Sequence, residues 1–308
     1  MIFEHFFNED ILIKVTLIDF IIDICETKWN AQYMIENGFI ERILAEAVAS
    51  GDVYGLINHR FILSIAFVYH KFPDTFSISD DYYHFLRANM ESNLQEDKDC
   101  VLNALFVILQ HKKSLERLTS DPNFIVDWLR CSNYLSEDLR KSFFMSLKSL
   151  LFMSDDLKED YNETIYKIFS NVKSPENYTE SNGSIKETVS YIAKYVMLPV
   201  EPTESKINYF LLLSELIQWH WGYKELFRNG DFVQYLLSRK VDAKEFVEAK
   251  YKFIEKAVMS PLIDKKFEAI DTSIAEQLKT YYKNGVYGVN VTDSEMVDEF
   301  QYATEKAG

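Results

Sequence analysis

The residues in this sequence that are best suited to bind a metal ion are histidines, and two of them stand at a helical spacing. His59 and His70 lie 11 positions apart, which is about three turns of an α-helix, so that one helix could present both on one face. A zinc site in a protein needs three or four ligands, and the sequence places no cysteine or acid with these two. We therefore expect a surface or core role for both histidines, and we predict no metal site and no cofactor.

The motifs that usually carry catalysis are absent. The sequence has no P-loop, no glycine-rich dinucleotide fingerprint, no HExxH zinc motif, no GxSxG nucleophile elbow and no paired CxxC. The segment Trp219-His220-Trp221 could form a ligand box, although two tryptophans more often pack as buried anchors at a helix corner. Single acids are plentiful, but nothing pairs them for acid–base work. The sequence thus predicts a protein that is not an enzyme and has no catalytic residues.

The sharpest charged cluster consists of Asp19, Asp23 and Glu26. Steps of four and three residues put these acids on one side of a helix, and that side of the helix carries no base. Like charges at this spacing repel one another mildly, and Lys or Arg side chains of a partner protein would compensate them. The cluster therefore indicates a protein-binding surface.

Helices are the elements that position these residues. Apolar residues make up 47% of the chain, which is ample for a continuous core, while 9 Gly and 6 Pro leave little material for the tight turns of an all-β protein. We expect a long helix over residues 11–26, a short one over 28–36 that ends at Asn37-Gly38, and a third from Phe39. Residues 206–219 form another long apolar helix, followed by a stop at Asn229-Gly230 and a new helix that opens at Phe232.

The helical pattern recurs along the chain. The segment from Trp29 to Ile40 matches the later segment from Trp221 to Val233, and Phe124 follows Phe39 after two steps of roughly 42 residues. Periods of about 40–47 residues are typical of HEAT and armadillo arrays. We predict an all-α fold, an armadillo/HEAT-like right-handed helical solenoid (α-α superhelix) of about six to seven irregular repeats. This array covers residues 1–285, and residues 286–308 form an extended C-terminal tail with a short helix.

Each long helix is apolar around most of its circumference and carries one narrow polar stripe. In a solenoid, the last helix of each repeat packs against neighbours on three sides, and its fourth side lines the concave binding face. Any helix in water also needs one wet side, but recurrence of the stripe on equivalent helices favours a continuous groove. The predicted partner-binding residues are Asp19, Asp23, Glu26, Arg60, Ser64, Lys71, Asp99, Asn103, Gln110, Lys141, Lys148, Asn208, Glu215 and Gln218.

The net charge of −15 limits the classes of partner. Binding to nucleic-acid phosphates or to anionic membranes requires clustered Lys and Arg, so we predict no nucleic acid and no membrane as partners. The same charge is compatible with a basic protein partner and equally with solubility alone. We expect the chain on its own to be a monomer.

Cysteine usage and the N-terminal segment indicate the compartment. Cys25, Cys100 and Cys131 are odd in number and scattered, which predicts buried free thiols in a reducing environment. The first ten residues lack the basic start and cleavage site of a signal peptide. The apolar run 11–25 is interrupted by charges and is too short to span a membrane. We expect a cytoplasmic or nuclear protein.

The C-terminal third resembles a known family. The segments that carry this resemblance are NGDFVQYLLSR (229–239), EAKYKFI (248–254) and LKTYYKNGVY (278–287), with similar motifs earlier at FNEDI (7–11) and YMIENGFI (33–40). They resemble the 26S proteasome non-ATPase regulatory subunit 5 family. The resemblance covers most of the chain in order. Its C-terminal run is distinctive, whereas the middle shares only the helical rhythm.

The resemblance implies an armadillo/HEAT-like chaperone for assembly of the proteasome regulatory particle. Members bind the C-terminal domain of an ATPase subunit of the base, keep an immature base from docking on the core particle, and have no catalytic activity. The chain begins where members are already within their array, so N-terminal repeats are expected to be missing. No contact residue can be transferred from the family. The alternative is a generic armadillo-type adaptor that binds an extended peptide.

Overall fold

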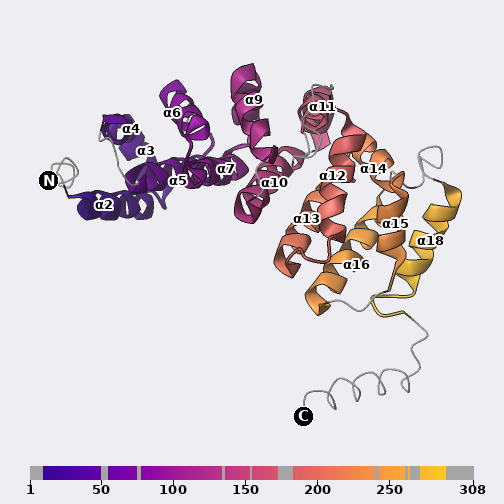
Figure 1. Cartoon of the computed structure of the whole chain (residues 1–308). Coiled ribbons are helices and arrows are strands. Elements are labelled where there is room, and N and C mark those ends of the chain that lie inside the picture. Colours follow the sequence, from indigo (N-terminus) through magenta and orange to yellow (C-terminus); the bar gives the residue numbers. More distant parts are fainter. Residues whose placement is uncertain are drawn as a thin grey trace, which may run out of the picture. The chain divides into compact units, whose positions relative to one another are not determined.

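The computed structural model describes residues 10–49, 55–74, 78–133, 136–152, 155–172, 183–239, 243–260, 263 and 271–288. Within these ranges every regular element is a helix, which confirms the predicted all-α class (Figure 1). The chain divides into two compact units, Met1–Thr188 and Val189–Gly308. The prediction of a single array over residues 1–285 stays a prediction.

Unit 1 contains α-helices of 8–16 residues and one 3₁₀ turn among its described residues. They are α2 (Ile11–Ile24), α3 (Lys28–Glu36), α4 (Phe39–Ala49), α5 (Leu56–Lys71), α6 (Asp80–Glu91), α7 (Gln95–Ile108), α8 (Lys112–Thr119), α9 (Pro122–Arg130), the 3₁₀ turn η1 (Cys131–Asn133), α10 (Glu137–Leu151) and α11 (Asp155–Ser170).

Unit 2 is also helical in its described residues. Helix α12 (Ile185–Met197) runs from the end of unit 1 into it, and the others are α13 (Thr203–Leu216), α14 (His220–Phe227), α15 (Gly230–Leu237), α16 (Lys244–Met259) and α18 (Thr272–Lys283).

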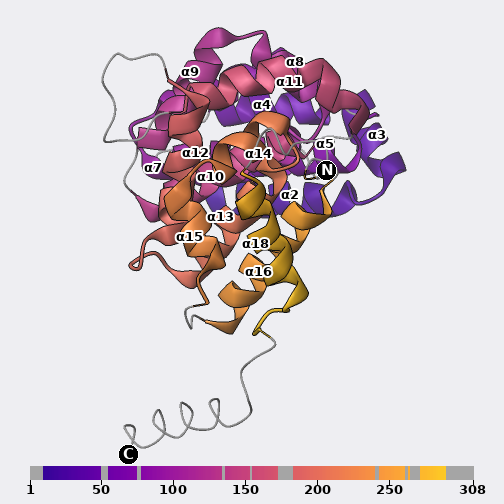
Figure 2. The ribbon, with the colours of Figure 1, turned by 90° about the vertical axis from the view of Figure 1, so that its right-hand side faces the viewer.

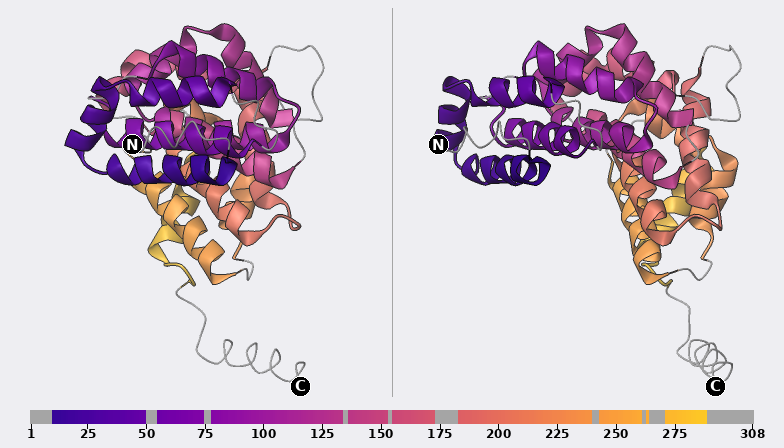
Figure 3. Two further views of the ribbon diagram at one scale, coloured as in Figure 1. Left: turned by 90° about the vertical axis from the view of Figure 1, so that its left-hand side faces the viewer. Right: turned by 60° about the vertical axis from the view of Figure 1, so that its left-hand side comes forward.

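In unit 1 the long helices α2, α5, α7 and α10 pack in succession, each against the next, and we call them the long-helix layer (Figures 1 and 3). The register between neighbours is nearly constant. Arg60 meets Asp19, and the Cys100 thiol meets the carbonyl of His59, each across 41 residues of sequence. This offset agrees with the period of roughly 42 residues in the sequence and is the packing of a helical solenoid.

Unit 2 follows the same plan around a cluster of phenylalanines. Helix α13 packs on α16, and α16 packs on α18 (Figure 2). The ring of Phe210 in α13 lies 5.4 Å from that of Phe246 and 5.5 Å from that of Phe253. Lys256 contacts Glu215 across 41 residues, so the two long helices keep the offset seen in unit 1.

Short polar residues begin and end these helices. The Asp10 carboxylate accepts hydrogen bonds from the backbone N–H groups of Leu12 and Ile13 at the start of α2. Gly38 has a φ of +66°, as expected for the predicted stop after α3. The stop predicted at Asn229-Gly230 is wrong in detail. Asn229 is the N-cap of α15 and Gly230 is its first residue, because the Asn229 side chain accepts a bond from the N–H of Phe232.

A buried base recurs near the start of the long helices. The fourth residue of α2, α5, α7, α10 and α13 is respectively Lys14, His59, Lys98, Arg140 and Lys206, and four of these five side chains are buried while His59 is half-buried. The Nζ of Lys98 donates to the carbonyls of Met90 (2.7 Å) and Ser92. In unit 2, Lys250 of α16 donates to the carbonyls of Tyr235 (2.8 Å) and Ser238. These lysines satisfy carbonyls that the preceding helix leaves unpaired at its C-terminus.

The predicted C-terminal tail lies mostly outside the described residues. Val286 and Tyr287, which the sequence predicts to be extended, lie in a turn after α18. Arg239 holds this turn, because its guanidinium donates to the carbonyls of Tyr281, Gly285 and Val286. The predicted short helix falls within residues 289–308, which the structure does not describe.

We expect Lys98→Met to destabilise the protein by about 2–3 kcal/mol, because it keeps the apolar stem but leaves two carbonyls without their charged donor. The midpoint of chemical unfolding, followed by circular dichroism, measures this loss. The control is Lys113→Met, at an exposed position of α8, which should change the free energy of unfolding by less than about 0.5 kcal/mol. Equal effects of the two substitutions would contradict the role given to Lys98.

Candidate protein-binding surface

The two histidines singled out in the sequence have separate partners. The Nε2 of His59 lies 2.6 Å from Oδ1 of Asp97, in α7. The Nδ1 of His70 lies 3.1 Å from Nε2 of His111, at the start of α8. Within the described residues, no three His, Cys, Asp or Glu side chains come together in a set that could hold a metal ion.

The tryptophan pair packs as a helix corner. Trp219 and Trp221 are both buried, and their ring centroids are 5.9 Å apart. His220 between them is exposed at the first position of α14. The three side chains therefore do not converge on one point.

The acidic cluster is partly compensated within the chain. The guanidinium of Arg60, in α5, lies 3.4 Å from the carboxylate of Asp19, in α2. Asp23 and Glu26 are exposed, Glu26 just beyond the end of α2. The sequence of α2 alone could not reveal this base, because it comes from the next long helix. Two acids remain on the surface at this end of the layer.

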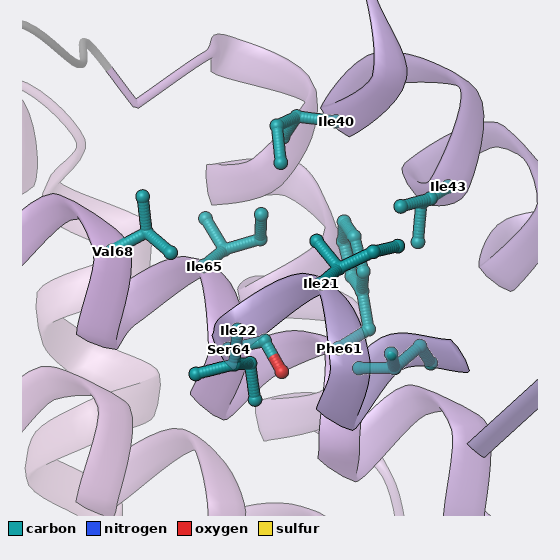
Figure 4. A pocket seen from close by; sticks show the side chains of 9 residues that line it. Ile21, Ile22, Ile40, Ile43, Phe61, Ser64, Ile65 and Val68 are labelled. Atoms are coloured by element: carbon teal, nitrogen blue, oxygen red, sulfur yellow. The ribbon is translucent and has the colours of Figure 1, made fainter. Parts of the chain in front are cut away.

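Ser64 is buried, although Arg60, Leu63 and Phe67 on the same helix are exposed. Its hydroxyl donates to the carbonyl of Arg60 (2.5 Å). It lines a small apolar cavity between α2, α4 and α5, together with Ile21, Ile40 and Ile43 (Figure 4). Ser64 is therefore part of the core and offers no contact to a partner, because its single donor is used within the helix.

The other predicted residues of α5 and α7 are accessible to different degrees. Lys71 is exposed at the end of α5, with its ammonium 5.8 Å from the ring centroids of Phe67 and Phe72. Asp99 and Asn103 are half-buried, and the Asn103 amide donates to the Asp99 carboxylate (3.1 Å).

The remaining predicted residues are also half-buried. The Gln110 amide donates to the carbonyl of Phe106 (3.1 Å). Lys141 and Lys148 lie on α10. Unit 2 contributes three side chains by itself, Asn208 and Glu215 on α13 and Gln218 in the turn that follows.

Sequence reasoning missed the apolar part of this surface. Phe20, Leu63 and Phe67 belong to the long-helix layer, and each exposes 40–46% of its surface. A polar stripe in the sequence does not reveal these three residues, because an apolar side chain in an apolar helix is expected to be buried. Exposed aromatic side chains beside charged ones are typical of protein-binding surfaces.

Fold and surface together define a class of protein. The chain is an all-helical repeat protein that displays aromatic, aliphatic and charged side chains on neighbouring long helices of unit 1. Such a surface can hold another protein by burial of apolar area and by charge pairing. No helix among the described residues has the length and apolar character that crossing a membrane demands.

One comparison with known protein families found a match in the C-terminal third of the chain. Residues 197–299, about a third of the chain, match the model of a family described as proteasome non-ATPase 26S subunit. The match relates this part of unit 2 to a proteasome-related family. No curated protein matches the chain.

The histidine pair predicts a pH dependence of stability. Burial, and secondarily the neighbouring His70, lower the pKa of His111 from its usual 6.5, while Asp74 opposes the shift. The unfolded chain therefore binds this proton at a higher pH than the folded chain, so stability is lost as the pH falls below about 6.5. We expect a lower melting temperature at pH 5 than at pH 7.5, and a smaller difference in His70→Ala. His84→Ala, at an exposed site on α6, should keep the full difference, and a full difference in His70→Ala would contradict the role of the pair.

The burial of the three cysteines predicts that their thiols react slowly. Burial raises the pKa of the Cys25 thiol to about 11 and those of Cys100 and Cys131 to about 12, so that little thiolate is present at pH 8. We expect the native protein to react slowly with a disulfide reagent at pH 8, and to release three thiols on unfolding. A fast native reaction of one thiol would show that it is accessible and activated.

Proposed function

We propose that this chain is an assembly chaperone of the 26S proteasome regulatory particle, without enzymatic activity, of the non-ATPase regulatory subunit 5 type. It binds the C-terminal domain of a base ATPase subunit and prevents premature docking of the base on the core particle. It works in the cytoplasm or the nucleus, as a monomer until it binds, and it needs no cofactor. The observation that carries this proposal is the match of residues 197–299 to a proteasome non-ATPase subunit family.

The surface of unit 1 supports a folded domain as the ligand. Phe20, Leu63 and Phe67 offer apolar area on neighbouring helices, while Asp23 and Glu26 remain available for basic residues of a partner. Area of this kind suits a complementary protein surface, because aromatic residues are enriched at protein interfaces and a few well-buried side chains dominate the binding energy.

An adaptor for extended peptides is the less favoured alternative. An extended peptide needs donors and acceptors for its backbone, repeated on each long helix. The candidates on α5 and α7 are already engaged, because Ser64 bonds its own helix and the Asn103 amide bonds Asp99. At these two positions the described surface therefore does not offer the regularly spaced donors and acceptors that a peptide backbone needs.

Isolated C-terminal domains of the base ATPase subunits provide the direct test. We expect at least one of them to bind the full chain in a pull-down and in calorimetry, and binding to none of them would sink the proposal. A peptide adaptor would instead bind unfolded segments and no intact domain.

Charge reversal tests the surface. Asp19→Lys combined with Asp23→Lys should weaken binding of that domain at least tenfold, because it replaces carboxylates with like charges toward a basic partner. The melting temperature should stay within a few degrees, since the Asp19–Arg60 pair is solvent-exposed and such pairs contribute less than about 1 kcal/mol. The control is Glu159→Lys with Asp160→Lys, an equal charge change at exposed positions of α11. A large loss of melting temperature with intact binding would show that the acidic stripe is structural.

A further inference from the structure

Helix α3 carries two of the most exposed aromatic side chains among the described residues. Trp29 is 82% exposed and Tyr33 is 60% exposed. They are four residues apart and lie on the same side of the helix. The opposite side is covered, since Ala31 and Met34 are buried. The Tyr33 ring lies 6.3 Å from that of Phe39, which extends the aromatic surface to the start of α4.

The equivalent position in unit 2 is covered by protein. Trp221 precedes the Asn229-Gly230 pair by the same interval that separates Trp29 from Asn37-Gly38. Trp221 is buried, with its ring beside that of Trp219. The tryptophan at this place in the repeat is thus buried in α14 and open to solvent in α3. Tryptophan is also the residue type most enriched among the energetic centres of protein interfaces.

Acids flank the two aromatic rings. Glu36 follows Tyr33 by three residues and falls on the aromatic side of α3. Glu26 lies in the turn that precedes α3, three residues before Trp29 in the sequence. Both are exposed, and the Glu36 carboxylate accepts a bond from the Gln32 amide (2.7 Å). Lys28 is one residue, or about 100°, away from Trp29 around the helix. One exposed acid thus precedes the aromatic pair in the sequence, and a second exposed acid follows it on the same side of α3.

We propose that this stripe, Glu26, Trp29, Tyr33 and Glu36, is a docking surface for a helix of a partner protein that presents Lys or Arg between aliphatic residues. A cation can lie over the indole or phenol face and pair with the carboxylate at either end. A second copy of this chain is a poor occupant, because two acidic stripes would face each other and each chain carries a net charge of −15. The inference deepens the proposed function by adding a contact chemistry for the same partner.

The first experiment uses the full chain and the base ATPase C-terminal domain that binds it. Trp29→Ala with Tyr33→Ala should weaken binding at least tenfold, and Glu26→Lys with Glu36→Lys should do the same, with a loss that shrinks at high salt. The melting temperature serves as the control for correct folding, and it should stay unchanged because all four side chains are exposed. The control is Lys28→Ala with Asn30→Ala, at the two exposed positions that lie about 100° to either side of Trp29 around α3, and this variant should bind normally. Unchanged affinity in both stripe variants overturns the inference and leaves the proposed function standing.

The second experiment does not depend on any ATPase domain. The probe is a designed 20-residue helix of Leu and Arg, with its Arg→Glu counterpart as control. The fluorescence of Trp29 reports peptide binding directly, because Trp128, Trp219 and Trp221 are buried. We expect a saturable change in tryptophan fluorescence with the Arg peptide and none with the Glu peptide. If no ATPase domain binds, the proposed function fails. The fluorescence titration with the two peptides then tests the docking surface on its own. An equal response to both peptides overturns it, and so does self-association, seen by light scattering, that is lost in Trp29→Ala with Tyr33→Ala.

Discussion

Contact between successive long helices at a nearly constant offset is the constraint on which this fold depends. A helix such as α5 or α7 is apolar on several sides, and it can leave water only between two neighbours of the same kind. The 41-residue separation of Asp19 from Arg60, of His59 from Cys100 and of Glu215 from Lys256 is the direct trace of this stacking. The outer short helices then cover the remaining apolar sides. Stability in such a fold is spread over many nearest-neighbour contacts, so each unit can be understood by itself.

The buried bases explain how helices that are not followed by a glycine can end in the protein interior. The last carbonyls of an α-helix have no partner within the helix, and a short connection leaves no room for water to reach all of them. Lys98 and Lys250 reach back to the carbonyls that end α6 and α15. Desolvation of an ammonium group is costly, and here it is offset because the charge meets the negative end of a helix. A lysine within an apolar helical segment, which looks like an interruption in the sequence, thus takes part in the packing of the helix.

The binding surface arises from what this stacking leaves uncovered. Each long helix keeps one side free of neighbours, and on unit 1 that side combines acids, bases and the rings of Phe20 and Phe67. Ser64 lies in the core, while Asp19 lies beside Arg60 and both of these side chains remain partly exposed. Helix α3 differs from its counterpart α14 in that its tryptophan is open to solvent. The described surface therefore has two candidate contact regions with different chemistry, one mixed and one aromatic and acidic.

The sequence by itself determined the helical class, the period near 42 residues and most helix limits, because those depend on local spacing of apolar residues and on short-range caps such as Asp10 and Gly38. It also indicated which side of each long helix is polar. Only the tertiary structure decided which of those polar side chains reach solvent, since the partners of Asp19, His59 and His70 come from helices some 40 residues away. Trp29 and Trp221 stand at the same interval before an Asn-Gly pair, yet Trp29 is exposed and Trp221 is buried beside Trp219, so this spacing alone does not determine accessibility. Local pattern fixes the element, and the neighbours fix its accessibility.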